Sequence, residues 1–324
     1  MKAITQDRYG DADVLTLSDI DQPVPGEGEV LVEVRAAGCG PDVWHVMTGK
    51  PYFARAMLGL RKPRTQVPGL DVAGVVVETG PGVVGFAVGD EVYGGSNGGS
   101  FAQLTVAKAD MLAHKPAGLT FVQAAAMPVS GCTALQALQR ADIAPGMRVL
   151  VIGAGGGVGV YATQIAVAMG ATVTGVCSAG KADFVRSLGA TSVIDYARDE
   201  VTRDGPVYDV IVDTAGNRPI SLLRKAMTPK GMLLIVGGEQ SGGSLLGGFQ
   251  RGLFSGVVSA FVSQRLAGVI ARVRAESLEE LTRLVDEGSV HPVVDRTFPL
   301  DEAADAVRAI ATHHTTGKLV VTVP

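Results

Sequence analysis

Cysteine, net charge and long apolar runs are all scarce in this chain. Its 324 residues include three cysteines, which are too few and too scattered for a disulfide framework. The formal net charge of −4 gives no overall attraction to phosphate groups, so neither a nucleic acid nor a membrane is an expected partner. The most apolar stretch, residues 256–273, includes Arg265 and Arg272 and lacks the ~18 uncharged residues of a membrane span.

The composition is typical of a globular protein of two domains. Hydrophobic residues make up 47% of the chain and charged residues 19%, which excludes a disordered polymer. A chain of 324 residues is longer than usually folds around a single hydrophobic core. The 43 glycines, nearly twice the usual share of ~7%, follow no three-residue period, so they serve turns and close backbone approaches. The polar opening, MKAITQDRYG, lacks a signal-peptide pattern, and we expect a cytoplasmic protein.

Two secondary-structure patterns divide the chain. In the first third, short valine-rich segments predict antiparallel strands of a barrel-like region. From about residue 121, Val/Ile/Leu runs alternate with helix-length segments, which predicts an α/β domain whose parallel sheet is covered on both faces by helices. A last strand, at 318–323, is expected to return to the first domain. The first set of strands is 29–36, 72–78, 90–93 and 102–106; the second is 148–152, 172–177, 192–194, 208–213, 232–236 and 266–273.

The sequence VLVIGAGGGVG, at 149–159, predicts a phosphate-binding turn. An apolar strand ends at Ile152 and a helix opens after it, and backbone N–H groups at a helix start are unpaired and attract anions. Glycine is required where a diphosphate approaches, because a side chain there would block it. The strict G-x-G-x-x-G spacing is not met, but the loop lies between a strand and a helix in a series of such units. The predicted contacts are Gly153, Gly156, Gly157, Val158 and Gly159.

The end of the next strand indicates which dinucleotide binds. An NAD site places Asp or Glu there to bind the ribose 2′-hydroxyl, whereas this chain has CSAGK at 177–181. Ser178 and Lys181 would bind a 2′-phosphate, which a carboxylate would repel, so NADP(H) is the expected cofactor. A helix N-cap and a solvated lysine are the alternative roles of this pair, and Asp183 argues mildly against a phosphate pocket.

Blocks along nearly the whole chain resemble the zinc-independent quinone reductase branch of the medium-chain dehydrogenase/reductase superfamily. They include PGLDVAGVVVETGPGV at 68–83, PVSGCTALQAL at 128–138, LGATSVIDY at 188–196, YDVIVDTAGN at 208–217 and GKLVVTV at 317–323. The resemblance implies a GroES-like catalytic domain of β-barrel type, interrupted by a Rossmann domain with a doubly wound parallel sheet, usually in a homodimer. The corresponding bounds are 1–122 and 274–324 for the first domain and 123–273 for the second.

The resemblance also implies cofactor contacts beyond the glycine loop. Ser178 and Lys181 match an SxxK pair of the family. Two further matches, Tyr196 and Thr133, also have alternative roles that involve no cofactor. On structural grounds alone, Tyr196 would be a packing residue and Thr133 a helix-turn hydroxyl. The implied contacts are Thr133 near the nicotinamide, Tyr196 beside the adenosine phosphate, Asn217, Gly237 and Gly238 along the ribose and nicotinamide, and Lys318 near the diphosphate.

The sequence departs from the zinc-dependent members of the superfamily. They carry G-H-E where this chain has Gly69, Leu70 and Asp71, so the imidazole ligand is absent. Cys39 lies near the first ligand position, but one thiolate does not complete the tetrahedral site that zinc requires. We therefore predict no metal.

Without a Lewis acid, reduction of a quinone or conjugated carbonyl is the most accessible hydride transfer, because conjugation carries the developing charge to oxygen. A hydrogen-bond donor then suffices, and His45 and Tyr52 are the candidate catalytic residues, near the positions of family tyrosines. Helix-face and rim-packing roles are the alternatives for these two side chains. Gly40 replaces an asparagine found in many quinone reductases.

The sequence thus predicts an NADPH-dependent oxidoreductase that transfers hydride to a small quinone, enone or other activated carbonyl. A zinc-free alcohol or aldehyde dehydrogenase is one alternative, and a non-catalytic NADPH-binding sensor or partner protein is another. The basic segment 50–64 is interpreted as a lid or a partner surface, and the loop at 241–262 as an edge of the substrate pocket.

Overall fold

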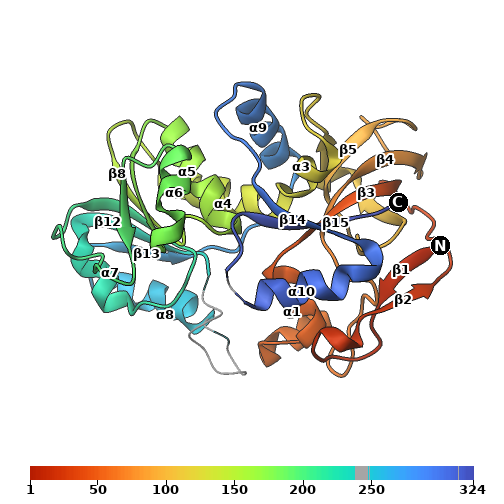
Figure 1. Ribbon diagram of the computed structural model, residues 1–324, viewed down its shortest axis with the longest axis horizontal. Coiled ribbons are helices and arrows are strands. Elements are labelled where there is room, and N and C mark those ends of the chain that lie inside the picture. Colours follow the sequence, from red (N-terminus) through yellow and green to blue (C-terminus); the bar gives the residue numbers. More distant parts are fainter. Residues whose placement is uncertain (238–246, 248, 313) are drawn as a thin grey trace. The chain divides into compact units, whose positions relative to one another are not determined.

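The computed structural model describes residues 1–237, 247, 249–312 and 314–324 (Figure 1). In it the chain folds into two compact units. Unit 1 comprises Met1–Cys132, Arg272–Glu287 and Pro292–Pro324, and unit 2 comprises Thr133–Ala271 and Gly288–His291. The first division falls within a helix, after Cys132, and the second after Ala271.

Unit 1 is built on a seven-stranded, mostly antiparallel sheet of order β14-β15-β3-β4-β5-β7, with β6 also paired to β3. β15 pairs antiparallel with β3, which confirms that the last strand returns to the first domain. β1 (Lys2–Thr5) and β2 (Thr16–Asp19) form a separate hairpin. The sheet strands are β3 (Glu29–Cys39), β4 (Asp71–Thr79), β5 (Glu91–Gly95), β6 (Leu104–Lys108), β7 (Leu112–His114), β14 (Val294–Pro299) and β15 (Lys318–Thr322).

Short helices pack on this sheet. The buried residues of α10 recur at helical spacing, at Ala303, Ala306, Val307 and Ile310, and they join a core with Val32, from β3. α3 begins at a capping box in which Thr120 and Gln123 satisfy each other's backbone N–H groups. The helices are α1 (Pro41–Thr48), α2 (Arg55–Leu58), α3 (Phe121–Ala125), α9 (Ala275–Asp286) and α10 (Ala303–Ala311), with 3-10 turns η1 (Ala12–Val14), η2 (Tyr52–Ala54), η3 (Ala109–Met111) and η5 (Leu300–Glu302).

Unit 2 contains the predicted parallel sheet, six strands in the order β10-β9-β8-β11-β12-β13. The order reverses at β8, and in Figure 1 α5 and α6 cover one face while α7 and α8 cover the other, which is a doubly wound arrangement. The strands are β8 (Arg148–Ile152), β9 (Thr172–Cys177), β10 (Ser192–Asp195), β11 (Tyr208–Asp213), β12 (Met227–Ile235) and β13 (Arg265–Gly268). The helices are α4 (Pro128–Arg140), which begins in unit 1, α5 (Gly157–Ala168), α6 (Ala182–Ser187), α7 (Ile220–Ala226) and α8 (Phe249–Ser259), with the 3-10 turn η4 (Ala179–Lys181).

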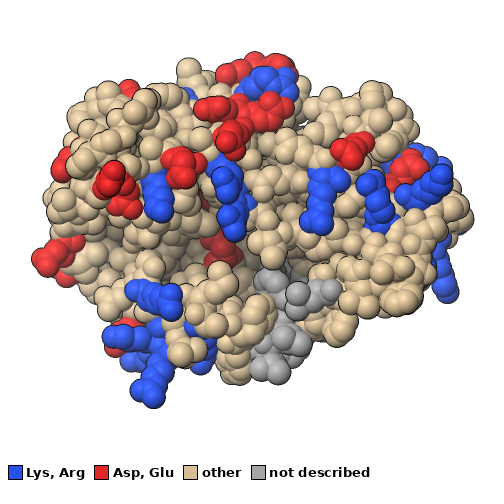
Figure 2. All heavy atoms as spheres, turned by 180° about the vertical axis from the view of Figure 1, so that it is seen from behind, with Lys and Arg blue, Asp and Glu red and all other residues tan. Residues whose placement is uncertain are grey.

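No helix in the described part of the chain is long and apolar enough to cross a membrane. On the face shown in Figure 2, acidic and basic side chains are scattered over a mainly uncharged surface.

Candidate functional site

The glycine loop joins β8 to α5 at the carboxyl edge of the parallel sheet. Gly153 has a φ of 81°, a left-handed conformation that favours glycine, and it turns the chain directly after Ile152. A Cβ at Gly159 would lie 2.0 Å from the carbonyl oxygen of Gly153, so only glycine permits this close packing of helix on strand. A Cβ at Gly156 would meet nothing closer than 3.4 Å, which leaves that position uncrowded.

The start of α5 offers main-chain donors to an anion. Its N-cap is Gly156, and no side chain caps the helix there. Gly157 and Val158 stand in the first turn, where N–H groups lack intrahelical partners and lie at the positive end of the helix dipole. These residues fit the diphosphate of a nicotinamide dinucleotide, because a diphosphate needs backbone donors without an obstructing side chain.

Ser178, Lys181 and Tyr196 gather at the ends of β9 and β10. Ser178 follows β9, and the N–H of Tyr196 donates to the carbonyl oxygen of Cys177, at 3.2 Å. The side chain of Lys181 runs beside the glycine loop, since its Cδ lies 3.0 Å from where a Cβ on Gly155 would stand. Tyr196 is 53% exposed, so it is not a core packing residue. The fold thus places the three residues at the strand ends beside the loop.

The acidic neighbour Asp183 has a partner of its own. Its carboxylate is fully exposed and lies 2.7 Å from the guanidinium of Arg186, one turn along α6. This pairing offsets the charge of Asp183, which therefore opposes an anion at Lys181 less strongly. Asp195, at the end of β10, likewise accepts a hydrogen bond from the N–H of Ala197, at 3.1 Å.

A buried ion pair, which the sequence did not reveal, fixes the loop after β11. Asp213 is fully buried, accepts a hydrogen bond from the N–H of Gly216 at 3.0 Å, and lies 2.8 Å from Nη2 of Arg251. Thr214 donates to the carbonyl oxygen of Ile152, at 2.7 Å, and thereby ties this loop to the end of β8. Arg251 is 38 residues from Asp213 and belongs to no motif, so only the fold identifies the pair.

The other predicted cofactor contacts of unit 2 lie in different settings. Asn217 is exposed and accepts a hydrogen bond from Arg218, at 3.3 Å. A Cβ at Gly237 would lie 2.2 Å from the carbonyl oxygen of Thr214, so the two strand-end loops approach each other closely. Thr133 is half-buried in α4. Gly238 lies outside the described residues.

The predicted donors His45 and Tyr52 lie near each other in the sequence of unit 1, on α1 and η2. Nδ1 of His45, which is half-buried, lies 2.6 Å from the carbonyl oxygen of Lys50. Tyr52 is 43% exposed, and the guanidinium of Arg55 lies 4.7 Å from its ring centre. The same guanidinium lies 4.4 Å from the ring centre of Tyr9, so it fastens the basic segment to the rest of unit 1.

A cluster of buried charges lies where β15, β4 and α1 begin. Nζ of Lys318 lies 2.8 Å from Oδ2 of Asp71, and both side chains are almost fully buried. Oδ1 of Asp71 accepts a hydrogen bond from the N–H of Val129, at 2.7 Å, and Lys318 donates to the hydroxyl of Ser130, at 3.4 Å. Burial acts to lower the pKa of Lys318, but the carboxylates of Asp71 and Asp42 outweigh it and raise that pKa, so the lysine is charged.

The resemblance implied a place near the diphosphate for Lys318, and the structure shows its surroundings within unit 1. The side chain is 3% exposed and is engaged by Asp71 within unit 1. Lys318 is the first residue of β15, a place where a lysine is ordinarily solvated, and the acceptors Asp71 and Ser130 make its burial possible.

The residues around Cys39 do not fit a zinc ion. Burial, together with the charge of Asp42, raises the pKa of the Cys39 thiol, so the thiolate that zinc binds is disfavoured. The ammonium of Lys318 is near enough to act on that thiol, and it would repel a divalent cation. Over residues 1–237, 247, 249–312 and 314–324, no group of three or more His, Cys, Asp or Glu side chains is arranged to hold a metal.

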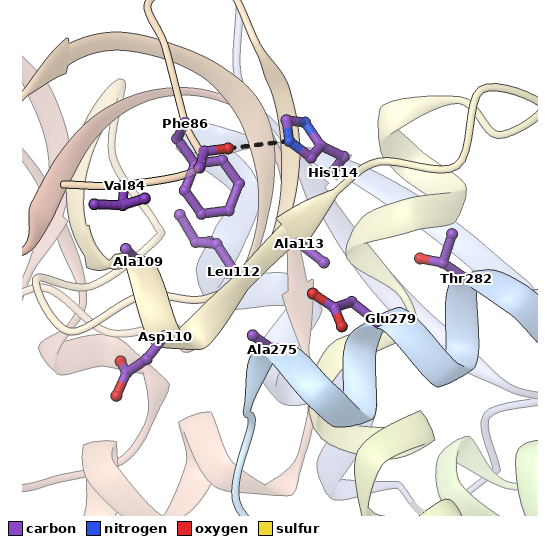
Figure 3. Close-up of a pocket in the computed structure, with 11 residues that line it drawn as sticks. Val84, Phe86, Ala109, Asp110, Leu112, Ala113, His114, Ala275, Glu279 and Thr282 are labelled. Carbon is purple, nitrogen blue, oxygen red and sulfur yellow. Dashed lines mark hydrogen bonds between the residues drawn. The ribbon is translucent and has the colours of Figure 1, made fainter.

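A separate hollow in unit 1, of about 440 Å³, is lined by residues from β7, α9 and the loop before β5 (Figure 3). Val84, Phe86 and Leu112 give it apolar walls, and His114 lies at its edge with Nε2 3.2 Å from the carbonyl oxygen of Gly85. It contains none of the predicted site residues, and we assign it no function.

Comparison with known proteins places both units in a known superfamily. Residues 26–117 match the alcohol dehydrogenase GroES-like domain, and residues 188–321 match a family described as zinc-binding dehydrogenase. The chain is 32% identical over 340 positions to the chloroplast envelope quinone oxidoreductase homolog of Arabidopsis thaliana, covering 99% of this chain and 98% of that protein. It is 34% identical over 335 positions to an NADPH-dependent alkenal/one oxidoreductase of the same plant, covering 99% and 79%. The solved quinone oxidoreductase of Coxiella burnetii matches with a TM-score of 0.85 and 29% identity, over 100% of this chain and 99% of that one.

Proposed function

The chain belongs to the quinone oxidoreductase-like branch of the medium-chain dehydrogenase/reductase superfamily, and on that premise we propose that it is an NADPH-dependent reductase of quinones, enones or other activated carbonyls, acting without a metal. The observation that carries the proposal is the start of α5 behind Gly153, which no side chain caps and which fits a dinucleotide diphosphate. The relatives named for activity on quinones and alkenals support the substrate class.

The preference for the phosphorylated cofactor is supported by the edge of β9. A hydroxyl and a cation, Ser178 and Lys181, stand where NAD-binding proteins carry an acid, and Lys181 runs beside Gly155 of the loop. A 2′-phosphate carries negative charge, so a lysine at this edge stabilises it and a carboxylate would not. One of the relatives is named as NADPH-dependent.

In the mechanism that we propose, a nicotinamide held by this chain would supply the hydride for an electron-poor carbon of the substrate. Gly157 and Val158 would hold the diphosphate through their backbone N–H groups, and Lys181 would hold the 2′-phosphate. Gly156, whose own N–H donates to the carbonyl oxygen of Gly153 at 2.9 Å, would leave room for the diphosphate because it has no side chain. His45 and Tyr52 are the groups of unit 1 proposed to donate a proton or hydrogen bond to the substrate oxygen as it becomes negative. Conjugation in the substrate moves charge to that oxygen, which is why a donor replaces a Lewis acid.

A panel assay tests this function and its alternatives. The purified protein is mixed with NADPH or NADH and a quinone, an enone or a saturated aldehyde, and with NADP⁺ and an alcohol, while absorbance of the reduced cofactor is followed. We expect NADPH consumption with the quinone or enone to exceed that with the aldehyde. Preferred alcohol oxidation would support the dehydrogenase alternative. Cofactor binding without any turnover would support a sensor and refute the reductase.

We further propose a homodimer in the cytoplasm. β13 is the edge strand of the six-stranded sheet, and apolar side chains around it are exposed, namely Phe254 (61%), Val257 (59%), Phe261 (84%) and Ile270 (88%). Exposed strand edges with apolar neighbours favour pairing with a second copy. The three cysteines are unpaired, as in a reducing compartment. A monomeric mass in light scattering at micromolar concentration would contradict the dimer.

A further inference from the structure

The end of β11, in unit 2, lies where the strand order of the parallel sheet reverses. Asp213, its last residue, pairs in register with Ile152, the last residue of β8, and on the other side with Ile235 of β12. In sheets of this kind a dinucleotide binds across the crevice at the reversal, with its diphosphate at the start of the first helix. Ser178 and Lys181, proposed to bind the 2′-phosphate of the adenosine half, follow β9 on one side of β8. The nicotinamide half would therefore extend to the other side, over the ends of β11 and β12.

Asp213 organises the loops at both of these strand ends. Its Oδ1 accepts a hydrogen bond from the N–H of Gly216, at 3.0 Å, in the loop after β11. Its carbonyl oxygen accepts hydrogen bonds from the N–H groups of Val236 and Gly237, at 2.9 and 3.2 Å, in the loop after β12. A change in the position of Asp213 would therefore move both loops.

Arg251, from the first turn of α8, engages the other oxygen of this carboxylate. Nη2 of Arg251 lies 2.8 Å from Oδ2 of Asp213 and donates to the carbonyl oxygen of Arg218, at 2.6 Å. The two acceptors stand at the beginning and the end of the segment 213–218, so one guanidinium group closes this loop. The side chain of Asp213 is fully buried and that of Arg251 is 11% exposed, so water competes little for the contact.

Stability alone does not account for the pair. A buried ion pair is often no more stabilising than apolar residues of the same volume, because both charges must leave water. The second amino group of Arg251, Nη1, is also buried and finds no hydrogen-bond acceptor among the residues that the structure describes. A buried donor without an acceptor is costly, so the presence of an arginine here calls for a role besides stability.

We propose that Arg251 is a positioning residue for the nicotinamide half of the cofactor. Through Asp213 it holds the loops after β11 and β12, and these loops set where the nicotinamide ring and its ribose can lie. The inference rests on the proposed function. Placement of the ring matters for hydride transfer, because a misplacement of about 1 Å can cost roughly 100-fold in rate. Binding of the adenosine half, on the other side of β8, should not depend on Arg251.

The substitution Arg251→Met tests the proposal, because methionine fills part of the space but makes neither contact of the guanidinium group. Arg224→Met is the matched control. Arg224 is half-buried in α7, and its Nε donates at 2.8 Å to Gln264, which precedes β13 at the opposite edge of the sheet. Binding of NADPH and of adenosine 2′,5′-bisphosphate, which lacks the nicotinamide half, is measured by calorimetry, together with the melting temperature and kcat for reduction of a quinone.

In Arg251→Met we expect the dissociation constant of NADPH to rise by roughly 10-fold, and that of the bisphosphate to change by less than about 2-fold. At saturating NADPH, kcat should fall by about 10-fold or more, because the ring is held less precisely. Arg224→Met should leave both dissociation constants and kcat within about 2-fold of the wild type. Asp213→Asn should also weaken NADPH binding, and combining it with Arg251→Met should cost less than the sum of the two single effects, because the two residues act as one unit.

Three outcomes would overturn the inference and leave the proposed function intact. One is an equal loss of affinity for NADPH and for the bisphosphate in Arg251→Met, which indicates a general structural role. Another is an Arg251→Met protein that matches Arg224→Met in NADPH affinity and kcat. The third is fully additive losses from Arg251→Met and Asp213→Asn, which would show that Arg251 does not act through Asp213.

If Arg251→Met does not fold, Arg251→Lys decides the question by the first two of these criteria. Lysine keeps a charge beside Asp213 but lacks the planar guanidinium fork. A wild-type protein that neither binds NADPH nor reduces a quinone or enone refutes the proposed function instead.

Discussion

Lys318 and Asp71 form an ion pair in which the ammonium nitrogen lies 2.8 Å from the carboxylate oxygen and neither side chain reaches the solvent. The two residues are the first of β15 and the first of β4, so the pair joins the beginning of the last sheet strand to that of an inner one. A buried charge that loses its partner is much more costly than an exposed one.

Lys318→Met should therefore lower the free energy of unfolding by about 3–5 kcal/mol, because Asp71 would be left buried and unpaired. Lys2→Met removes the exposed pair with Asp19, at 2.7 Å, and should cost below about 1 kcal/mol. Adding Asp71→Asn to Lys318→Met should recover part of the loss. Urea denaturation of the variants measures all three effects, and equal costs for the two lysines would contradict the prediction.

The stability of the protein should depend on the protonation of Asp42. Its pKa is raised in the folded state, so between the unfolded value of ~3.9 and the folded value the folded protein holds a proton that the unfolded chain has lost. Stability contributed by this group is therefore complete at low pH and is lost as pH rises through that interval. Asp42→Asn removes the dependence, and its melting temperature relative to wild type should increase from pH 4 to pH 8. A difference that stays constant with pH would contradict this.

Lys181→Ala should weaken NADPH binding by about 10-fold or more, the value of a charge-assisted hydrogen bond of ~1.5–3 kcal/mol. NADH, which has no 2′-phosphate, should bind with nearly unchanged affinity. Lys225→Ala, at an exposed lysine of α7, is the control for loss of a cation. Fluorescence titration with both cofactors gives the dissociation constants. Equal losses for NADPH and NADH would reject the assignment of Lys181.

Gly40→Ala should destabilise unit 1 by about 1–3 kcal/mol, the usual cost of overpacking. The added methyl group would stand 2.5 Å from Asp42 and 2.7 Å from Lys318, which are both held in the charge cluster. Gly118→Ala places a methyl group with nothing within 4 Å and serves as the control. The melting temperatures of the two variants are compared by thermal unfolding. A Gly40→Ala protein as stable as the control would contradict the prediction, because it would show that Asp42 and Lys318 can shift to accommodate the methyl group.

Activity should persist when the protein is treated with a chelator. Leu70 stands where a zinc enzyme has histidine, and Cys39 is buried near a cation. Elemental analysis of the purified protein should find far less than one zinc per chain. Loss of activity on chelation, with recovery on adding zinc, would overturn this expectation.

The parallel sheet could be predicted because its strands are continuous apolar runs. β8 and β11 begin and end at the predicted residues, since runs of Val, Ile and Leu form their centres, at 149–152 and 210–212. β14 could not be predicted, because VDRTFP has no fully buried side chain and shows no apolar period. It is a strand only because β15 supplies its hydrogen bonds.

The candidate site was predictable to the extent that it depends on local backbone geometry. The loop at 153–159 follows from glycine spacing between a strand and a helix, and Ser178 and Lys181 follow from their place at a strand end. The pairs Asp213–Arg251 and Asp71–Lys318 join residues far apart in the sequence, and no local pattern marks them. The burial of the Asp42 carboxyl near both charges of the second pair is likewise revealed only by the fold.

The position of β15 has a consequence for synthesis of the protein. β15 lies between β14 and β3, so the sheet of unit 1 has a gap beside β3 until residues 318–322 have left the ribosome. Unit 2, apart from four residues at Gly288–His291, is present once Ala271 has emerged. We therefore expect unit 2 to fold first on the nascent chain. The edge of β3 that pairs with β15 should remain exposed until β15 has been synthesised.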